Sequence, residues 1–117
     1  MSEVQIWHNP RCSKSREAMK LLEESGVDAD VVKYLEVEPD EEMIKDLLKK
    51  LGIHAKELIR TKEDIYKELK LAGVDDEGTL IRAMSRFPKL IERPIVIKGN
   101  KAVIGRPPEK IVEFLKG

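Results

Sequence analysis

The chain has 117 residues, of which 41% are hydrophobic and 38% are charged, a composition that suits one domain with a single core. Basic and acidic side chains both number 22, so a net charge of +0 gives no attraction toward nucleic acid or an anionic membrane. The single cysteine excludes an internal disulfide and a zinc site built from several cysteines.

The N-terminal third predicts a strand, a helix and a second strand. Residues 4–7 are a short apolar strand, and residues 13–25 carry apolar side chains at helical spacing. Gly26 is well placed to end that helix in a left-handed conformation, and residues 29–34 predict the second strand. A strand, helix and strand in this order predict a right-handed parallel crossover.

The middle third predicts helices. Asp40 is a good N-cap for a helix that ends at Gly52, and residues 54–59 suit one or two further turns. The segment 61–64 (Thr-Lys-Glu-Asp) resembles a capping box, with Asp64 where Glu or Gln is usual. Residues 76–86 predict another helix.

The C-terminal third predicts a β-hairpin and a last helix. Residues 95–97 and 102–104 read as strands joined by a turn at Gly99-Asn100. Pro107-Pro108 begins the final helix, with Pro108 suited to its first position.

The summed order is βαβ, a helical block, then ββα. This order predicts an α/β fold of thioredoxin/glutaredoxin type, in which a four-stranded mixed sheet carries a helical insertion at approximately residues 40–92. We expect residues 1–117 to form a single thioredoxin-like domain. Because the sequence shows neither a signal peptide nor the ~18–20 apolar residues of a membrane span, we expect a cytoplasmic protein without membrane contact.

Cys12 is the candidate reactive residue. It lies between the first predicted strand and the first predicted helix, where backbone N–H groups and the helix dipole favour a negative charge. Arg11 is adjacent, and Arg16 lies one helical turn away on the same face. These factors lower a thiol pKa from ~8.5 to roughly 3.5–7.5 in known cases. The alternative is that a lone cysteine is a small buried hydrophobic residue.

Three motifs resemble one enzyme family. They are His-Asn-Pro-Arg-Cys-Ser-Lys-Ser-Arg at 8–16, Arg-Pro-Ile-Val at 93–96, and Ile-Gly-Arg-Pro-Pro-Glu at 104–109. Their identity and order resemble the arsenate reductase family of the glutathione/glutaredoxin-dependent type, over essentially the whole chain. That resemblance implies a thioredoxin-like fold with a helical insertion and the thiol-dependent reduction of arsenate to arsenite.

The resemblance also implies roles for individual residues. Cys12 matches the catalytic cysteine, and three arginines match those that bind the oxyanion, namely Arg60, Arg93 and Arg106. Two more residues, His8 and Ser15, match those near the thiolate, and we add Arg16 to this thiolate-tuning group. Each has a plainer alternative: a half-buried histidine, a serine of a first helical turn, or a solvated arginine.

The implied chemistry fits these residue types. Arsenate is a tetrahedral dianion, and guanidinium groups bind oxyanions through two parallel hydrogen bonds. The arginines also stabilise charge that develops on oxygen as the thiolate attacks arsenic. No second cysteine exists, so a thiol redox cycle needs an external donor, which the resemblance identifies as glutathione with glutaredoxin as partner. We expect no bound cofactor and no metal.

Two other functions stay open. The related Spx-type transcription regulators carry Cys-x-x-Cys here, but this chain has Ser15 at the second position and cannot form that disulfide. A non-catalytic protein-binding module of this fold remains an alternative. The other is a glutathione-linked protein thiol-transferase without arsenate activity.

Overall fold

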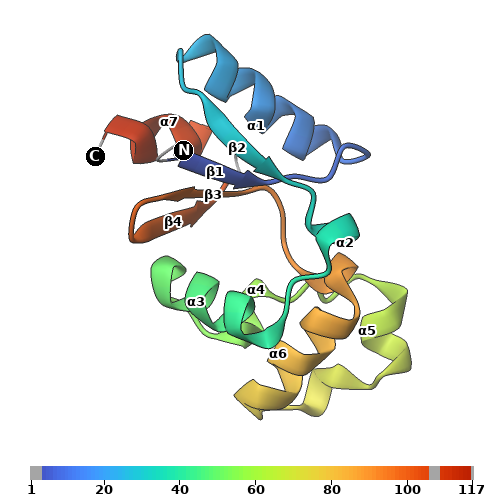
Figure 1. Ribbon diagram of the computed structural model, residues 1–117. Helices are drawn as coiled ribbons and strands as arrows, with labels where there is room; N and C mark the ends of the chain where they lie inside the picture. Colours follow the sequence, from blue (N-terminus) through green and yellow to red (C-terminus); the bar gives the residue numbers. More distant parts are fainter. Residues whose placement is uncertain (1–3, 106–108, 117) are drawn as a thin grey trace. The chain divides into compact units, whose positions relative to one another are not determined.

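A computed structural model describes residues 4–105 and 109–116 (Figure 1). The chain divides into two compact units. The first, here called the sheet unit, holds residues 1–37 and 93–117, and the second, the helical unit, holds residues 38–92. The description of residues 1–117 as one domain with an insertion stays a prediction.

The sheet unit is built on a four-stranded mixed sheet in the order β2-β1-β3-β4. Its strands are β1 (Val4–Trp7), β2 (Ala29–Val32), β3 (Ile95–Lys98) and β4 (Lys101–Ile104). The β1–β2 pair is parallel, and the β1–β3 and β3–β4 pairs are antiparallel. This confirms the predicted thioredoxin-like α/β arrangement, including the parallel pair that the strand–helix–strand order requires.

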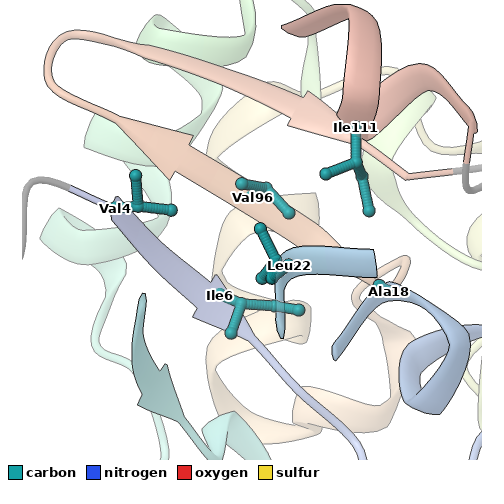
Figure 2. Close-up of a cluster of buried hydrophobic side chains, with 6 residues drawn as sticks. All are labelled: Val4, Ile6, Ala18, Leu22, Val96 and Ile111. Atoms are coloured by element: carbon teal, nitrogen blue, oxygen red, sulfur yellow. The ribbon is translucent and has the colours of Figure 1, made fainter. Parts of the chain in front are cut away.

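Two helices, α1 (Ser13–Glu24) and α7 (Glu109–Lys116), contribute to the main core of this unit. Figure 2 shows side chains of both helices against those of β1 and β3, with Val4 and Ile6 at alternate positions of β1. The buried cluster consists of Val4, Ile6, Ala18, Leu22, Val96 and Ile111. Burying each larger aliphatic side chain contributes about 1.5–3 kcal/mol, so this cluster anchors both helices to the sheet.

The C-terminus of α1 has the geometry predicted from Gly26. This glycine adopts φ 72°, and its N–H donates to the carbonyl of Glu23 at 3.1 Å. The N–H of Val27 donates to the carbonyl of Leu22 at 3.0 Å, which completes a Schellman motif. The left-handed residue turns the chain toward β2.

The second strand is shorter than predicted, because Tyr34 belongs to a helical turn. After β2 ends at Val32, the chain forms α2 (Tyr34–Val37). The carbonyl of Lys33 accepts from the N–H groups of Glu36 and Val37 at 2.9 and 3.0 Å. Tyr34 is fully buried and stacks on Trp7 with ring centroids 5.9 Å apart. Tyr34 is therefore buried by its contact with Trp7 and not by a place in β2, where the sequence pattern assigns it.

The hairpin and the last helix lie close to their predicted positions. Lys98 pairs with Lys101 across the turn, so each strand is one residue longer than predicted, and Gly99 adopts φ 59°. The helix α7 is described from Glu109, and the predicted start at Pro108 lies outside the described residues. The Arg93–Pro94 peptide bond is cis.

The helical unit contains four α-helices and two 3-10 turns among its described residues. In chain order these are α3 (Glu41–Leu51), α4 (Ala55–Leu58), α5 (Asp64–Glu68), η1 (Leu71–Gly73), α6 (Glu77–Arg86) and η2 (Pro88–Leu90). Asp40 caps α3 by accepting from the N–H of Met43 at 2.8 Å. This confirms the predicted N-cap at Asp40. Asp76, predicted as the first residue of a helix, is the N-cap of α6 and accepts from the N–H of Thr79 at 2.9 Å.

The predicted capping box at residues 61–64 is wrong. The N-cap of α5 is Glu63, and its side chain does not cap the helix. That carboxylate instead contacts the guanidinium of Arg60. A cap at Thr61 requires a helix that begins at Lys62, but α5 begins at Asp64. No helix within the described ranges 4–105 and 109–116 is long and apolar enough to cross a membrane.

Candidate active site around Cys12

Cys12 is the N-cap of α1, as its position in the sequence predicted. It has an extended backbone (φ −96°, ψ 122°), and its carbonyl accepts from the N–H of Arg16 at 3.0 Å. Its own N–H donates to the carbonyl of Asn9 at 3.0 Å, which closes the loop after β1. The residue is 9% exposed. The thiol is thus held at the positive end of a helix of 12 residues, where the dipole favours an anion.

Ser15 and His8 form a buried polar pair beside this helix start. The hydroxyl oxygen of Ser15 lies 2.7 Å from Nδ1 of His8 and accepts from the N–H of Asn9 at 3.0 Å. Ser15 is completely buried and His8 is 8% exposed. His8 is fixed from the other side, because its N–H donates to the carbonyl of Val32 at 2.9 Å. Buried polar groups that are satisfied in this way hold a loop in one conformation.

The electrostatics keep His8 neutral near pH 7. Burial lowers the pKa of His8 below its ordinary 6.5, and the positive charges of Lys33 and Arg16 lower it further. A neutral imidazole can either donate from Nδ1 to the Ser15 oxygen or accept the Ser15 hydroxyl proton there. The neutral His8 can therefore orient the Ser15 hydroxyl without adding a positive charge near Cys12.

The two arginines near Cys12 in sequence have different environments. The guanidinium of Arg16 donates from Nη1 to the carbonyl of Pro10 at 3.0 Å, so it folds back over the loop. The backbone N–H of Arg11 donates to the side-chain oxygen of Asn9 at 3.0 Å, and the Arg11 side chain is exposed. Arg16 is therefore the cation whose position the loop fixes.

Strand register brings the Arg93–Pro94 segment to the end of the sheet that carries the Cys12 loop. Trp7, the last residue of β1, pairs with Ile95, the first residue of β3. Ile95 also pairs with Ile104, the last residue of β4. The strand ends that lead to residues 8–12, to Arg93 and to Gly105 therefore lie side by side. Arg106 itself lies outside the described residues.

Gly105 closes this end of the sheet by a tight contact. Its N–H donates to the carbonyl of Pro94 at 2.8 Å. A Cβ at this position would lie 2.7 Å from Cδ1 of Ile111 and 3.1 Å from Cγ of Pro94. Only glycine fits between the Pro94 loop and α7, so this residue fixes the approach of the Arg93 segment.

Arg60 lies in the helical unit, with carboxylate partners. Its Nη1 is ion-paired with Glu63, and its Nε lies 3.8 Å from a carboxylate oxygen of Glu92. Neither acidic partner is predicted from the sequence. Glu63 had a signal, because it lies three residues from Arg60. Glu92 had none, because its approach depends on the pairing of Ile59 with Ile91.

Asn9 is a third residue that the sequence analysis missed, although its backbone and side chain both shape the loop. His54 lies in the helical unit, 83% exposed and 3.4 Å from Glu77. Within the described part of the chain, no group of three or more His, Cys, Asp or Glu side chains could hold a metal ion.

The sequence and the fold are both similar to those of known proteins. The sequence model of the ArsC family matches residues 7–114. The chain is 56% identical to the uncharacterized protein YfgD of Escherichia coli (strain K12), over 97% of either chain. It is 51% identical to an arsenate reductase of Neisseria meningitidis serogroup A, over 98% of this chain and 100% of that one. A solved arsenate reductase from Vibrio cholerae has a TM-score of 0.91 at 47% identity, over 94% of this chain and 95% of that one.

Proposed function

Because this chain belongs to the ArsC family, we propose that it reduces arsenate to arsenite with Cys12 as the nucleophile. The observation that supports this most directly is the placement of the only cysteine at the N-terminus of α1, beside the buried His8–Ser15 pair. A fixed helix dipole and a nearby hydrogen-bond donor are features that stabilise a thiolate. The names of similar proteins, among them the Neisseria meningitidis enzyme, supply the substrate class.

In this proposal His8, Ser15 and Arg16 tune the thiolate. Ser15 lies three residues after Cys12 in the first turn of α1, a spacing at which a side chain can reach back toward the N-cap. His8 fixes the Ser15 hydroxyl, and Arg16 adds positive charge over the loop. None of these groups has to transfer a proton to arsenate.

Arg60, Arg93 and Arg106 are the proposed ligands of the oxyanion. Strand register supports Arg93, because its segment precedes β3 at the end of the sheet where the Cys12 loop follows β1. Arg106 is proposed on the motif match, since it follows Gly105 in sequence. Arg60 is proposed on the motif match as well. Guanidinium groups suit this role because they stay charged and offer paired N–H donors.

The reaction needs two electrons, and the chain supplies one thiol. The Cys12 thiolate attacks arsenic and displaces an oxygen that leaves as water after protonation. A glutathione thiolate then attacks the Cys12 sulfur, a Cys12–glutathione disulfide forms, and the bonding pair remains on arsenic as arsenite departs. Glutaredoxin reduces the mixed disulfide and regenerates the thiol. This dependence on glutathione leads us to propose a cytoplasmic location.

Intact-protein mass spectrometry tests the redox step. Incubation with arsenate and glutathione, without glutaredoxin, should give a glutathione adduct that tryptic mapping places on Cys12. Later addition of glutaredoxin should remove the adduct. Glutathione disulfide in place of arsenate and glutathione tests the alternative by thiol–disulfide exchange. An adduct that forms with glutathione disulfide but not with arsenate and glutathione would support a protein thiol-transferase, and no adduct under either condition would support a binding module.

A further inference from the structure

The Arg60 guanidinium contacts two carboxylates, and a role in oxyanion binding requires neither of them. Glu63 is ion-paired with Nη1, and Glu92 lies 3.8 Å from Nε. With one cation and two carboxylates, this cluster has a net charge of −1 when all three groups are ionised. A dianionic substrate that approaches Arg60 must therefore compete with two carboxylates that already contact the guanidinium.

This cluster differs from the other ion pairs among the described residues. Arg60, Glu63 and Glu92 have side chains that are 21%, 25% and 27% exposed. In the pair between Lys56 and Asp75, which belongs to the same unit, the side chains are 60% and 83% exposed. Exposed pairs contribute little, because solvent screens them. The ion pairs of the Arg60 cluster are the least exposed pairs among the described residues, so solvent screens their charges least.

The two carboxylates are held differently. Arg60 and Glu92 lie on paired backbone segments, where Arg60 N–H donates to the carbonyl of Leu90 at 2.7 Å and Glu92 N–H donates to the carbonyl of Leu58 at 3.0 Å. Glu63 instead follows a turn and precedes α5, a helix of five residues. Glu92 is thus placed beside Arg60 by backbone pairing, whereas Glu63 lies outside that pairing and contacts the guanidinium through its side chain.

We propose that Glu63 is an internal competitor for the oxyanion, and that Glu92 is the positioning residue that orients Arg60. The carboxylate of Glu63 occupies the Nη1 edge of the guanidinium, and a bound oxyanion takes its place there. Glu92 stays beside Nε and keeps the guanidinium plane in position. The consequence is a lower affinity for every anion that uses the Nη1 edge, because each anion must first displace the carboxylate of Glu63. This inference rests on the proposed function of Arg60.

The test measures the dissociation constant for arsenate by calorimetry, with the full-length chain carrying Cys12→Ser so that no covalent step intervenes. In that background, Glu63→Gln should bind arsenate about fivefold more tightly, because the competing charge is gone. Glu92→Gln should bind about fivefold more weakly, because the guanidinium plane loses its contact at Nε, and equal or tighter binding would overturn the role of Glu92. Asp75→Asn is the matched control, since it removes an exposed carboxylate of the same unit, and it should leave the dissociation constant unchanged.

Glu63→Ser is a second variant for the same prediction. The substitution removes the negative charge and places serine, a preferred N-cap residue, at the start of α5. A folding defect in Glu63→Gln would therefore not be expected in Glu63→Ser. Both Glu63 variants should also bind nitrate, a monoanion, more tightly than the parent chain does. Unchanged or weaker arsenate binding in both would overturn the role of Glu63. If Cys12→Ser binds arsenate and the added Arg60→Ala substitution leaves its dissociation constant unchanged, this inference and the role of Arg60 as an oxyanion ligand both fail, while arsenate reduction by Cys12 stands. If Cys12→Ser binds no arsenate, the inference and the proposed function both fail.

Discussion

The hydroxyl oxygen of Ser15 lies 2.7 Å from Nδ1 of the buried His8 and also accepts the N–H of Asn9. When Nδ1 carries the imidazole proton, the Ser15 oxygen receives two donors, and we propose that its own hydrogen is then directed to the Cys12 thiolate. The burial of both side chains holds this geometry. A donor fixed in this way stabilises a thiolate without the rotamer entropy that an exposed serine would lose.

Ser15→Ala should make Cys12 less acidic. A hydrogen bond to a charged group contributes about 1.5–3 kcal/mol, so the midpoint of alkylation should rise by about one pH unit or more. The measurement is the rate of iodoacetamide modification against pH, in the parent chain and in the variant. Ser13→Ala changes an exposed serine of the same helix turn and serves as the control. An identical midpoint in Ser15→Ala and Ser13→Ala would show that Ser15 only packs the helix start.

His8 should make folding stability fall in mild acid. Burial and nearby cations lower its pKa in the folded state, while the unfolded chain keeps the ordinary value of 6.5. As the pH drops below 6.5, the unfolded state takes up the proton first, so stability is lost until the folded-state pKa is reached. Urea unfolding at pH 7.5 and 5.5 measures the loss. His8→Asn should lose less stability between these values than the parent chain.

His54→Asn is the matched control for that experiment, because His54 is the other histidine of the chain and is 83% exposed. Its stability should depend on pH as the parent chain's does. Equal losses of stability between pH 7.5 and 5.5 in His8→Asn and in the parent chain would show that protonation of His8 does not contribute to the pH dependence of folding.

Gly105→Ala should destabilise the sheet unit. The added Cβ would meet Cδ1 of Ile111 at 2.7 Å, and such overpacking costs about 1–3 kcal/mol. Ile111→Val removes that methyl group and should restore part of the loss, so the two substitutions should not be additive. Thermal unfolding of the single and double variants measures this coupling. Gly73→Ala, which meets nothing within 4 Å, should leave the melting temperature nearly unchanged. Additive losses would contradict the contact.

Lysine cannot replace the proposed oxyanion-binding arginines. Arg93→Lys and Arg106→Lys keep the charge but lose the paired donors, so each should lower kcat/KM for arsenate by about 10- to 100-fold, which corresponds to about 1.4–2.8 kcal/mol. Arg11→Lys, at an exposed side chain of the Cys12 loop, should keep full activity. Equal kinetics in Arg93→Lys and Arg11→Lys would remove Arg93 from the site.

The features that the sequence predicted correctly depend on neighbouring residues. Asp40 caps a helix whose first turn follows it directly, and Gly26 ends α1 through bonds within one turn. The position of Cys12 at the start of α1 is of the same kind. Local hydrogen-bonding rules decide each of these features, so the chain order alone was sufficient.

The features that the sequence did not predict depend on distant partners. Tyr34 belongs to α2 and stacks on Trp7, a contact that its local pattern did not indicate. Glu92 reaches Arg60 because two segments about thirty residues apart in the sequence pair through Ile59 and Ile91. Such contacts follow from tertiary packing, which no window of the sequence contains.

The central claim is that Cys12 reduces arsenate with electrons from glutathione. Its most direct test is arsenate-dependent NADPH oxidation, coupled through glutathione reductase with glutathione and a panel of glutaredoxins. The parent chain should turn over, and the Cys12→Ser variant should show only the rate of the reaction without enzyme. The absence of arsenate-dependent turnover in the parent chain with every glutaredoxin, or equal turnover by the two proteins, would contradict the claim.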